Sequence, residues 1–96
     1  MSEKVEVENV NHPSRTARVD AVKYAEMKRA MLVALPHSAP GATQAEIRNL
    51  VRPHLSQEHF PQGATSGWWA KTVQLDLEAK GKMVREEAKP LRWHLT

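Results

Sequence analysis

The chain has 96 residues, of which 41% are apolar and 26% are charged, and its formal net charge is +3. This length predicts one domain, and the sequence has no apolar run approaching the roughly 18 residues of a membrane-spanning helix. The absence of cysteine excludes disulfides, thiolate metal sites and cysteine nucleophiles.

The mildly basic charge permits a nucleic-acid partner but does not require one. The opening residues, MSEKVEVENV, contain no apolar stretch that resembles a secretory signal. We therefore expect a cytoplasmic protein with no membrane partner.

The first nineteen residues predict a β element. Residues 4–8 alternate apolar and charged side chains with period 2, which is typical of a strand with one buried face. Residues 11–14 have turn chemistry, and residues 16–19 can return as a second strand. We expect residues 1–19 to form an N-terminal extension or hairpin beside a domain at residues 20–96.

Two helices are predicted in the first half of that domain. Asp20 is placed to cap the first, which carries apolar residues at helical spacing until Pro36 stops it. Thr43 and Glu46 form the pattern of a capping box for the second helix. Pro53 cannot continue the backbone hydrogen bonding, so this second helix is short.

A third helix and a β-hairpin complete the predicted order. The third helix runs to residue 80, with Thr65 or Ser66 as its cap and Gly81 at its end. Residues 82–86 and 91–95 are the two strands of the hairpin. One face of the second strand carries Leu91, Trp93 and Leu95.

This order of elements, with a short second helix and a third ending in Leu77-x-x-x-Gly81, resembles the winged helix-turn-helix over roughly residues 20–96. Residues 60–64 and 67–81 also look like an uncharacterised family of small bacterial winged-helix-like proteins, a likeness that would cover nearly the whole chain. The predicted fold class is α+β: a winged helix-turn-helix with an N-terminal β element.

The winged-helix resemblance implies binding to double-stranded DNA, with a role in transcriptional regulation. In that superfamily the third helix commonly lies in the major groove, and the wing touches phosphates or the minor groove. The side chains whose chemistry fits these roles are Lys71, Thr72 and Gln74 on the third helix and Arg85, Lys89 and Arg92 on the hairpin. The alternative for the hairpin is ordinary solvated charge, partly paired with Glu86 and Glu87.

The third helix carries apolar residues on two sides. Trp69, Val73 and Leu77 form the expected core stripe, whereas Trp68 and Leu75 lie on the far side. A monomer does not ordinarily leave such a pair in water. We expect the N-terminal segment or a second subunit to cover Trp68 and Leu75. The second function class is therefore a non-enzymatic protein-interaction or dimerisation module that uses this face.

The sequence gives little support for a catalytic site or a metal site. The five histidines show no ligand spacing, and the serines have no nucleophile-elbow context. The four glycines form neither a dinucleotide fingerprint nor a P-loop. We expect no enzyme activity, cofactor, metal or small-molecule substrate.

Overall fold

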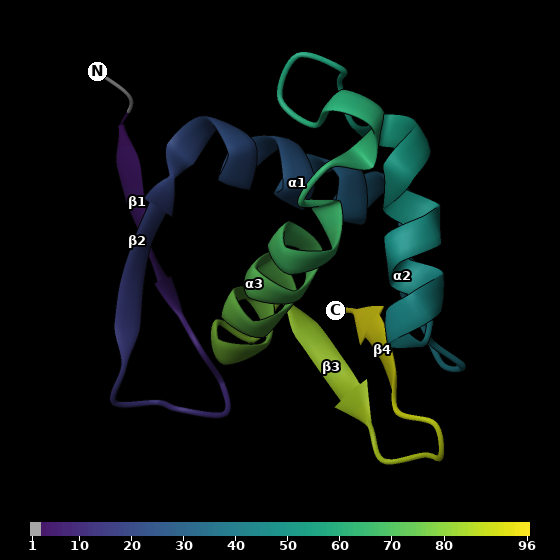
Figure 1. The fold of residues 1–96 in the computed structure, drawn as a ribbon. Coiled ribbons are helices and arrows are strands. Elements are labelled where there is room, and N and C mark those ends of the chain that lie inside the picture. The colour runs from purple at the N-terminus through teal and green to yellow at the C-terminus, as the bar shows by residue number, and fades with distance from the viewer. Residues whose placement is uncertain (1–2) are drawn as a thin grey trace.

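The N-terminal hairpin is the first element of the structure, a computed structural model that describes residues 3–96. Strands β1 (Lys4–Glu8) and β2 (Thr16–Asp20) pair antiparallel, with Val5 opposite Val19. Figure 1 shows this hairpin as an arm beside the helices. The predicted hairpin is confirmed, and residues 1–2 of the predicted extension lie outside the described residues.

Three helices form the centre of the molecule: α1 (Ala21–Ala34), α2 (Gln44–Val51) and α3 (Ser66–Ala79). Short 3-10 turns at Arg52–His54 and Pro61–Gly63 join α2 to α3. All three helices contact one another, and α3 lies in front of α1 in Figure 1. The core between them includes Met27, Met31, Ile47, Val51, Val73 and Leu77.

The first two helices begin as their sequences predict. The Asp20 carboxylate accepts hydrogen bonds from the backbone N–H groups of Val22 at 2.9 Å and Lys23 at 3.1 Å. These hydrogen bonds, the one from Lys23 foremost, hold the pKa of Asp20 below its usual value. Thr43 and Glu46 form both bonds of the capping box. The two predicted caps are confirmed.

The start of α3 differs from the prediction. Thr65 occupies the cap position in a left-handed conformation with φ of 59°, and its hydroxyl donates to the Ala64 carbonyl oxygen at 2.6 Å. The side chain is therefore turned away from the free N–H groups of the helix. No side-chain cap forms at this end.

Strands β3 (Met83–Glu86) and β4 (Arg92–Leu95) form the predicted C-terminal hairpin. Ala42, which precedes α2, exchanges two backbone hydrogen bonds of 2.8 Å with Trp93. This bridge ties the hairpin to the start of α2. Trp93 and Leu95 are buried as predicted, whereas Leu91 precedes the strand and is 38% exposed.

The two hairpins lie on different sides of the helices (Figure 1). The fold is a mixed α+β domain of three helices and two separate two-stranded antiparallel sheets. Across residues 3–96, no helix combines the length and apolar character needed to cross a membrane.

Candidate functional site

A groove separates the N-terminal hairpin from α3. This hairpin groove has a volume of about 290 Å³. Its lining residues are Val7, Glu8, Asn9, His12, Arg15, Thr16, Ala17, Val19, Trp68, Thr72 and Leu75. Trp68 and Leu75, the apolar pair predicted on the far side of the third helix, both line this groove.

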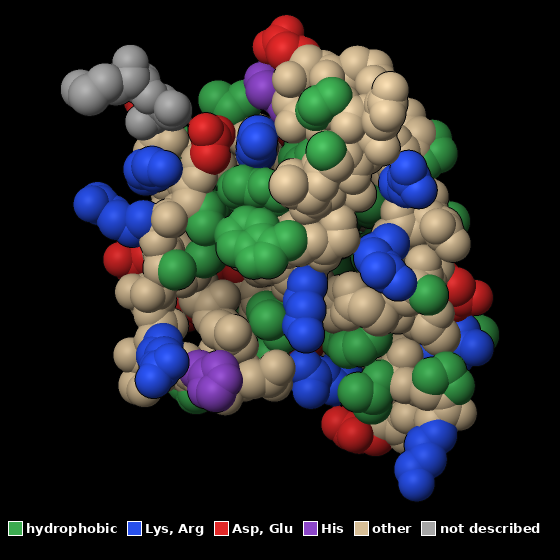
Figure 2. Space-filling view, in the orientation of Figure 1, with side chains coloured by type: hydrophobic (Ala, Val, Ile, Leu, Met, Phe, Trp, Pro, Cys, Tyr) green, Lys and Arg blue, Asp and Glu red, His purple; other side chains and the backbone are tan. Residues whose placement is uncertain are grey.

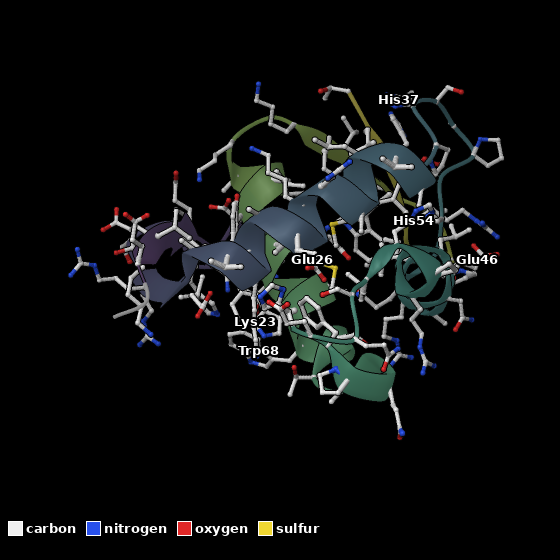
Figure 3. The ribbon with its side chains drawn as sticks, turned by 90° about the horizontal axis from the view of Figure 1, so that it is seen from above. Lys23, Glu26, His37, Glu46, His54 and Trp68 are labelled. Carbon is white, nitrogen blue, oxygen red and sulfur yellow. The ribbon has the colours of Figure 1, made fainter. Side chains whose placement is uncertain are left out.

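The expected cover over Trp68 and Leu75 forms only in part. Leu75 is 9% exposed, so it is buried within the chain. Trp68 is 57% exposed and lies at the edge of the molecule in Figure 3. The hairpin is anchored beside Leu75, where the Glu8 N–H donates to Asp76 at 2.8 Å. Trp68 lies about 12 Å from Asp76, toward the N-terminal end of α3, and the hairpin does not cover it.

Of the three predicted contact residues on α3, two face outward and one does not. Lys71 is exposed and Thr72 is half-buried. Gln74 is buried, with 1% of its surface exposed. Its burial follows from the packing of α3, which contacts α1, α2, β1 and β3 and is buried continuously over residues 73–77.

The predicted arginines of the C-terminal hairpin are paired with carboxylates. Arg85 contacts Glu78 at 3.2 Å, and Arg92 contacts Glu46 at 3.3 Å. These partners differ from the expected Glu86 and Glu87, because the hairpin packs against α2 and α3. Of the three basic residues predicted on this hairpin, only Lys89, in the exposed β3–β4 turn, takes no part in these two ion pairs.

Basic side chains from neighbouring elements flank the outward side of α3. Arg48 of α2 lies over the first turn of α3. If Gly67 in that turn carried a Cβ, the Cβ would lie 3.4 Å from the Arg48 Cδ. Arg15 lines the hairpin groove with Thr72. Figure 2 shows this face, with Lys and Arg side chains over and around α3. Neither Arg15 nor Arg48 is among the candidates selected from the sequence, because their positions beside α3 depend on the packing of distant segments.

A second, smaller pocket lies between α3, the start of α2 and the C-terminal hairpin. This polar pocket has a volume of about 190 Å³. It is lined by Asn11, Gln44, Lys71, Gln74, Leu75, Arg85, Leu91 and Trp93. It brings together Lys71, Gln74 and Arg85, three of the residues that the sequence selected for DNA. Asn11 and Gln44, which complete it, carry no local sequence signal because they come from distant segments.

Residues 4–93 match a family of unknown function, DUF6958. The chain belongs to this family. The match covers the N-terminal hairpin, all three helices and the C-terminal hairpin as far as Trp93, so the predicted membership of an uncharacterised family is confirmed. No curated protein and no solved structure gives a significant match to the chain.

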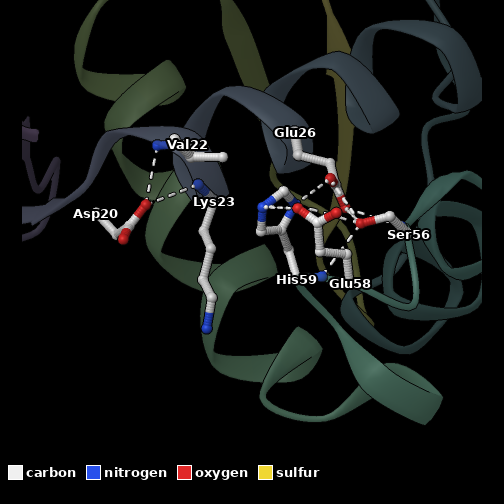
Figure 4. A network of polar contacts seen from close by, with 7 residues as sticks. All are labelled: Asp20, Val22, Lys23, Glu26, Ser56, Glu58 and His59. Atoms are coloured by element: carbon white, nitrogen blue, oxygen red, sulfur yellow. Dashed lines mark hydrogen bonds and ion pairs between the residues drawn. The ribbon is translucent and has the colours of Figure 1, made fainter. Parts of the chain in front are cut away.

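This DUF6958 chain also brings Ser56 and His59, on the loop after α2, against the carboxylate of Glu26 on α1 (Figure 4). The Ser56 hydroxyl donates to Glu26 at 2.9 Å, and the Ser56 N–H donates to the same carboxylate at 2.8 Å. His59 Nδ1 lies 3.0 Å from Glu26 and 3.3 Å from the Ser56 oxygen. The other ring nitrogen, Nε2, lies 3.2 Å from Glu58. A catalytic triad has the reverse arrangement, with the serine hydroxyl at Nε2 and the acid at Nδ1.

The Glu26 cluster is better described as a clamp that fixes the loop after α2 to α1. Burial raises the pKa of Glu26, but hydrogen bonds from Ser56 and His59 outweigh it and leave that pKa below its usual value. Glu26 is labelled beside α1 in Figure 3. Within residues 3–96, no three His, Asp or Glu side chains are grouped to hold a metal ion.

Proposed function

We propose that the chain is a winged-helix protein that binds double-stranded DNA through the outward side of α3. The observation that carries this proposal is the placement of Arg15, Arg48 and Lys71, which come from three elements and flank that side. Cations arranged around a helix can neutralise phosphates while the helix enters the major groove.

The attachment of the C-terminal hairpin supports the winged-helix part of the proposal. The Ala42–Trp93 bridge fixes the hairpin beside the start of α2. The Trp93 Nε1–H donates to Glu78 of α3 at 2.8 Å, which fixes the hairpin to α3 as well. A hairpin held against both helices can act as a wing whose tip carries Lys89. A role in transcriptional regulation would follow from such DNA binding.

Within this proposal the two wing arginines have different roles from Lys71. Arg85 and Arg92 position the wing through Glu78 and Glu46. Lys71 and Lys89 are exposed and supply charge to phosphates. Lys71→Ala should therefore weaken DNA binding more than Arg92→Ala does, when the two affinities are compared for the folded fraction of each variant.

Fluorescence anisotropy with a labelled mixed-sequence duplex tests the proposal. We expect binding at low salt, with a log–log salt slope of about −0.9 per contacted phosphate. Lys71→Ala and Arg48→Ala should each reduce the size of the slope by about 1. Arg29→Ala, an equal charge change on the exposed side of α1, is the matched control and should leave the slope unchanged. An absence of binding at low salt, or an equal loss in the control, would contradict the proposal.

The exposed indole of Trp68 favours a second function, binding to another protein or to a second copy of this chain. Aromatic side chains beside an apolar hollow are frequent anchors of protein interfaces. In the dimer case, Trp68→Ala should raise the dissociation constant by about 30-fold, which sedimentation equilibrium measures. Val84→Ala, an exposed apolar change on β3, should have no effect. A wild-type chain that remains monomeric at high concentration would exclude the dimer.

A further inference from the structure

Trp68 is the one exposed aromatic side chain among residues 3–96, and it borders the hairpin groove. The other four aromatic side chains, Tyr24, Phe60, Trp69 and Trp93, are buried. Figure 2 shows the face on which hydrophobic side chains are exposed with Lys and Arg side chains beside them. The fold therefore leaves a single flat apolar ring in water at the edge of a hollow of about 290 Å³.

Packing against buried rings fixes the Trp68 indole. Its centre lies 5.1 Å from the centre of the Trp69 ring, and the two planes meet at 83°. Trp69 in turn packs edge-on against Phe60, at 6.5 Å and 89°. Perpendicular rings touch edge to face, so Trp69 covers at most one face of the Trp68 indole. The exposed indole therefore keeps a face on which a planar group can stack, at a low cost in side-chain entropy.

Cationic side chains come to this indole from two elements. On α3, Lys71 and Thr72 follow Trp68 by three and four residues, so all three lie on one side of the helix, and Lys71 is exposed. Across the groove, the Arg15 N–H donates to the His12 carbonyl oxygen at 2.9 Å, so one tight turn carries both residues. Arg15 and His12 both line the groove.

The charge around Trp68 favours a polyanion over a protein partner. Glu8 is the single acidic residue among those that line the groove. Because Val7 points into the core, alternation along β1 places the Glu8 side chain on the opposite face. Charged residues, lysine above all, are depleted at the centres of protein interfaces. An aromatic ring beside Lys71 and Arg15 instead has the composition of a single-stranded nucleic-acid site.

We propose that the hairpin groove binds an unpaired base of a single-stranded nucleic acid. The base stacks on the Trp68 indole, and Lys71 and Arg15 neutralise the phosphates beside it. The groove, at about 290 Å³, is at the lower limit of the roughly 300–1,000 Å³ of small-molecule sites, which suits one planar ring. A duplex keeps its bases paired and stacked, so this binding does not depend on the duplex binding proposed above.

Three oligomers of equal length test the proposal by fluorescence anisotropy at low salt. They are octathymidylate, octauridylate and an abasic octamer that carries the same phosphates without bases. We expect the chain to bind octathymidylate about tenfold more tightly than the abasic octamer, because only the first can stack. Octauridylate should show the same preference over the abasic octamer. The ratio of the two base-containing affinities distinguishes DNA from RNA as the source of the base.

Trp68→Ala should remove the tenfold preference and leave the affinity of the wild type for the abasic octamer. Because Trp68 is exposed, this variant should fold, and circular dichroism checks that it does. Trp68→Phe retains a flat ring and should keep most of the preference. Val33→Ala, an exposed apolar change on α1, is the matched control and should leave the preference unchanged.

Intrinsic fluorescence identifies the ring that stacks. Trp69 and Trp93 are buried, so quenching by octathymidylate should come from Trp68. Trp68→Phe should lose this quenching although it still binds the oligomer.

Arg15→Ala tests the contact with phosphate separately. It should weaken the binding of octathymidylate and of the abasic octamer alike, and reduce the size of the log–log salt slope by about 0.7. Arg29→Ala, the same charge change on the exposed side of α1, should leave the slope unchanged.

The proposal is wrong if the wild type binds octathymidylate and the abasic octamer equally, or binds neither at low salt. It is also wrong if folded Trp68→Ala keeps the preference. A wild-type dimer that dissociates in Trp68→Ala, without binding of octathymidylate, would assign the indole to a protein interface instead. None of these titrations contains a duplex, so their failure would leave the duplex proposal to its own test.

Discussion

Replacing Asp76 with alanine is expected to lower the free energy of unfolding by about 3 kcal/mol. Asp76 has no exposed surface and accepts hydrogen bonds from β1, from α1 and from Lys80 at the end of its own helix. Its donors are the Glu8 N–H at 2.8 Å, the Tyr24 hydroxyl and the Lys80 ammonium at 3.0 Å. The alanine variant leaves the buried Tyr24 hydroxyl without a partner, at a cost of about 1–3 kcal/mol, and the loss of the part-buried bond from the Glu8 N–H adds to this.

Lys80 adds little to that loss, because its side chain is 37% exposed and can return to water. Burial, together with the hydrogen bond to Asp76 and its charge, raises the pKa of Tyr24 above its usual value. The tyrosine is therefore a neutral donor at physiological pH, and its bond to Asp76 is charge-assisted.

Urea denaturation of the Asp76→Ala variant measures this effect, with Asp20→Ala as the matched control. Asp20 caps α1 from a more exposed position, and its loss should cost about 1 kcal/mol. Hydrogen exchange provides a second measurement, because the Glu8 N–H should lose protection only in the Asp76 variant. A smaller loss of stability for Asp76→Ala than for Asp20→Ala would contradict the assigned role.

Replacing Gly41 with alanine should cost about 3 kcal/mol or more, because the added methyl group meets backbone atoms. A Cβ at this position would lie 2.6 Å from the Glu86 carboxylate, and closer still to the Trp93 carbonyl group. The Gly41 N–H donates to that same carboxylate at 2.7 Å. The methyl group therefore pushes the C-terminal hairpin away and breaks the Ala42–Trp93 bridge.

Gly67→Ala is the matched control for this prediction. A Cβ at Gly67 meets only the Arg48 side chain, at 3.4 Å, and alanine favours the helix in which Gly67 lies. The control should be neutral or stabilising by up to about 1 kcal/mol. Thermal unfolding followed by circular dichroism compares the two variants. A Gly41→Ala protein as stable as the wild type would show that the hairpin is not fixed at this point.

Local sequence patterns predicted the elements of this fold because their causes are local. The caps at Asp20 and Thr43 each depend on residues within one helical turn. Pro36 and Gly81 likewise mark helix ends through their own backbone chemistry. The start of α3 escaped prediction, because a threonine at that position normally caps a helix and here has a left-handed backbone.

The candidate sites were less predictable because they depend on contacts between distant segments. Side-chain chemistry selected Gln74 for DNA, but Gln74 is 1% exposed because α3 packs against α1, α2, β1 and β3. Arg85 and Arg92 had plausible partners nearby in the sequence, yet they pair with Glu78 and Glu46. The sequence identifies the charged side chains, but the packing of the chain determines which of them form ion pairs.

Leu75 lines both the hairpin groove and the polar pocket. One side chain therefore contributes apolar surface to both hollows. A single substitution, Leu75→Ala, would change the shape of both at once, so the two hollows cannot be altered independently at this position.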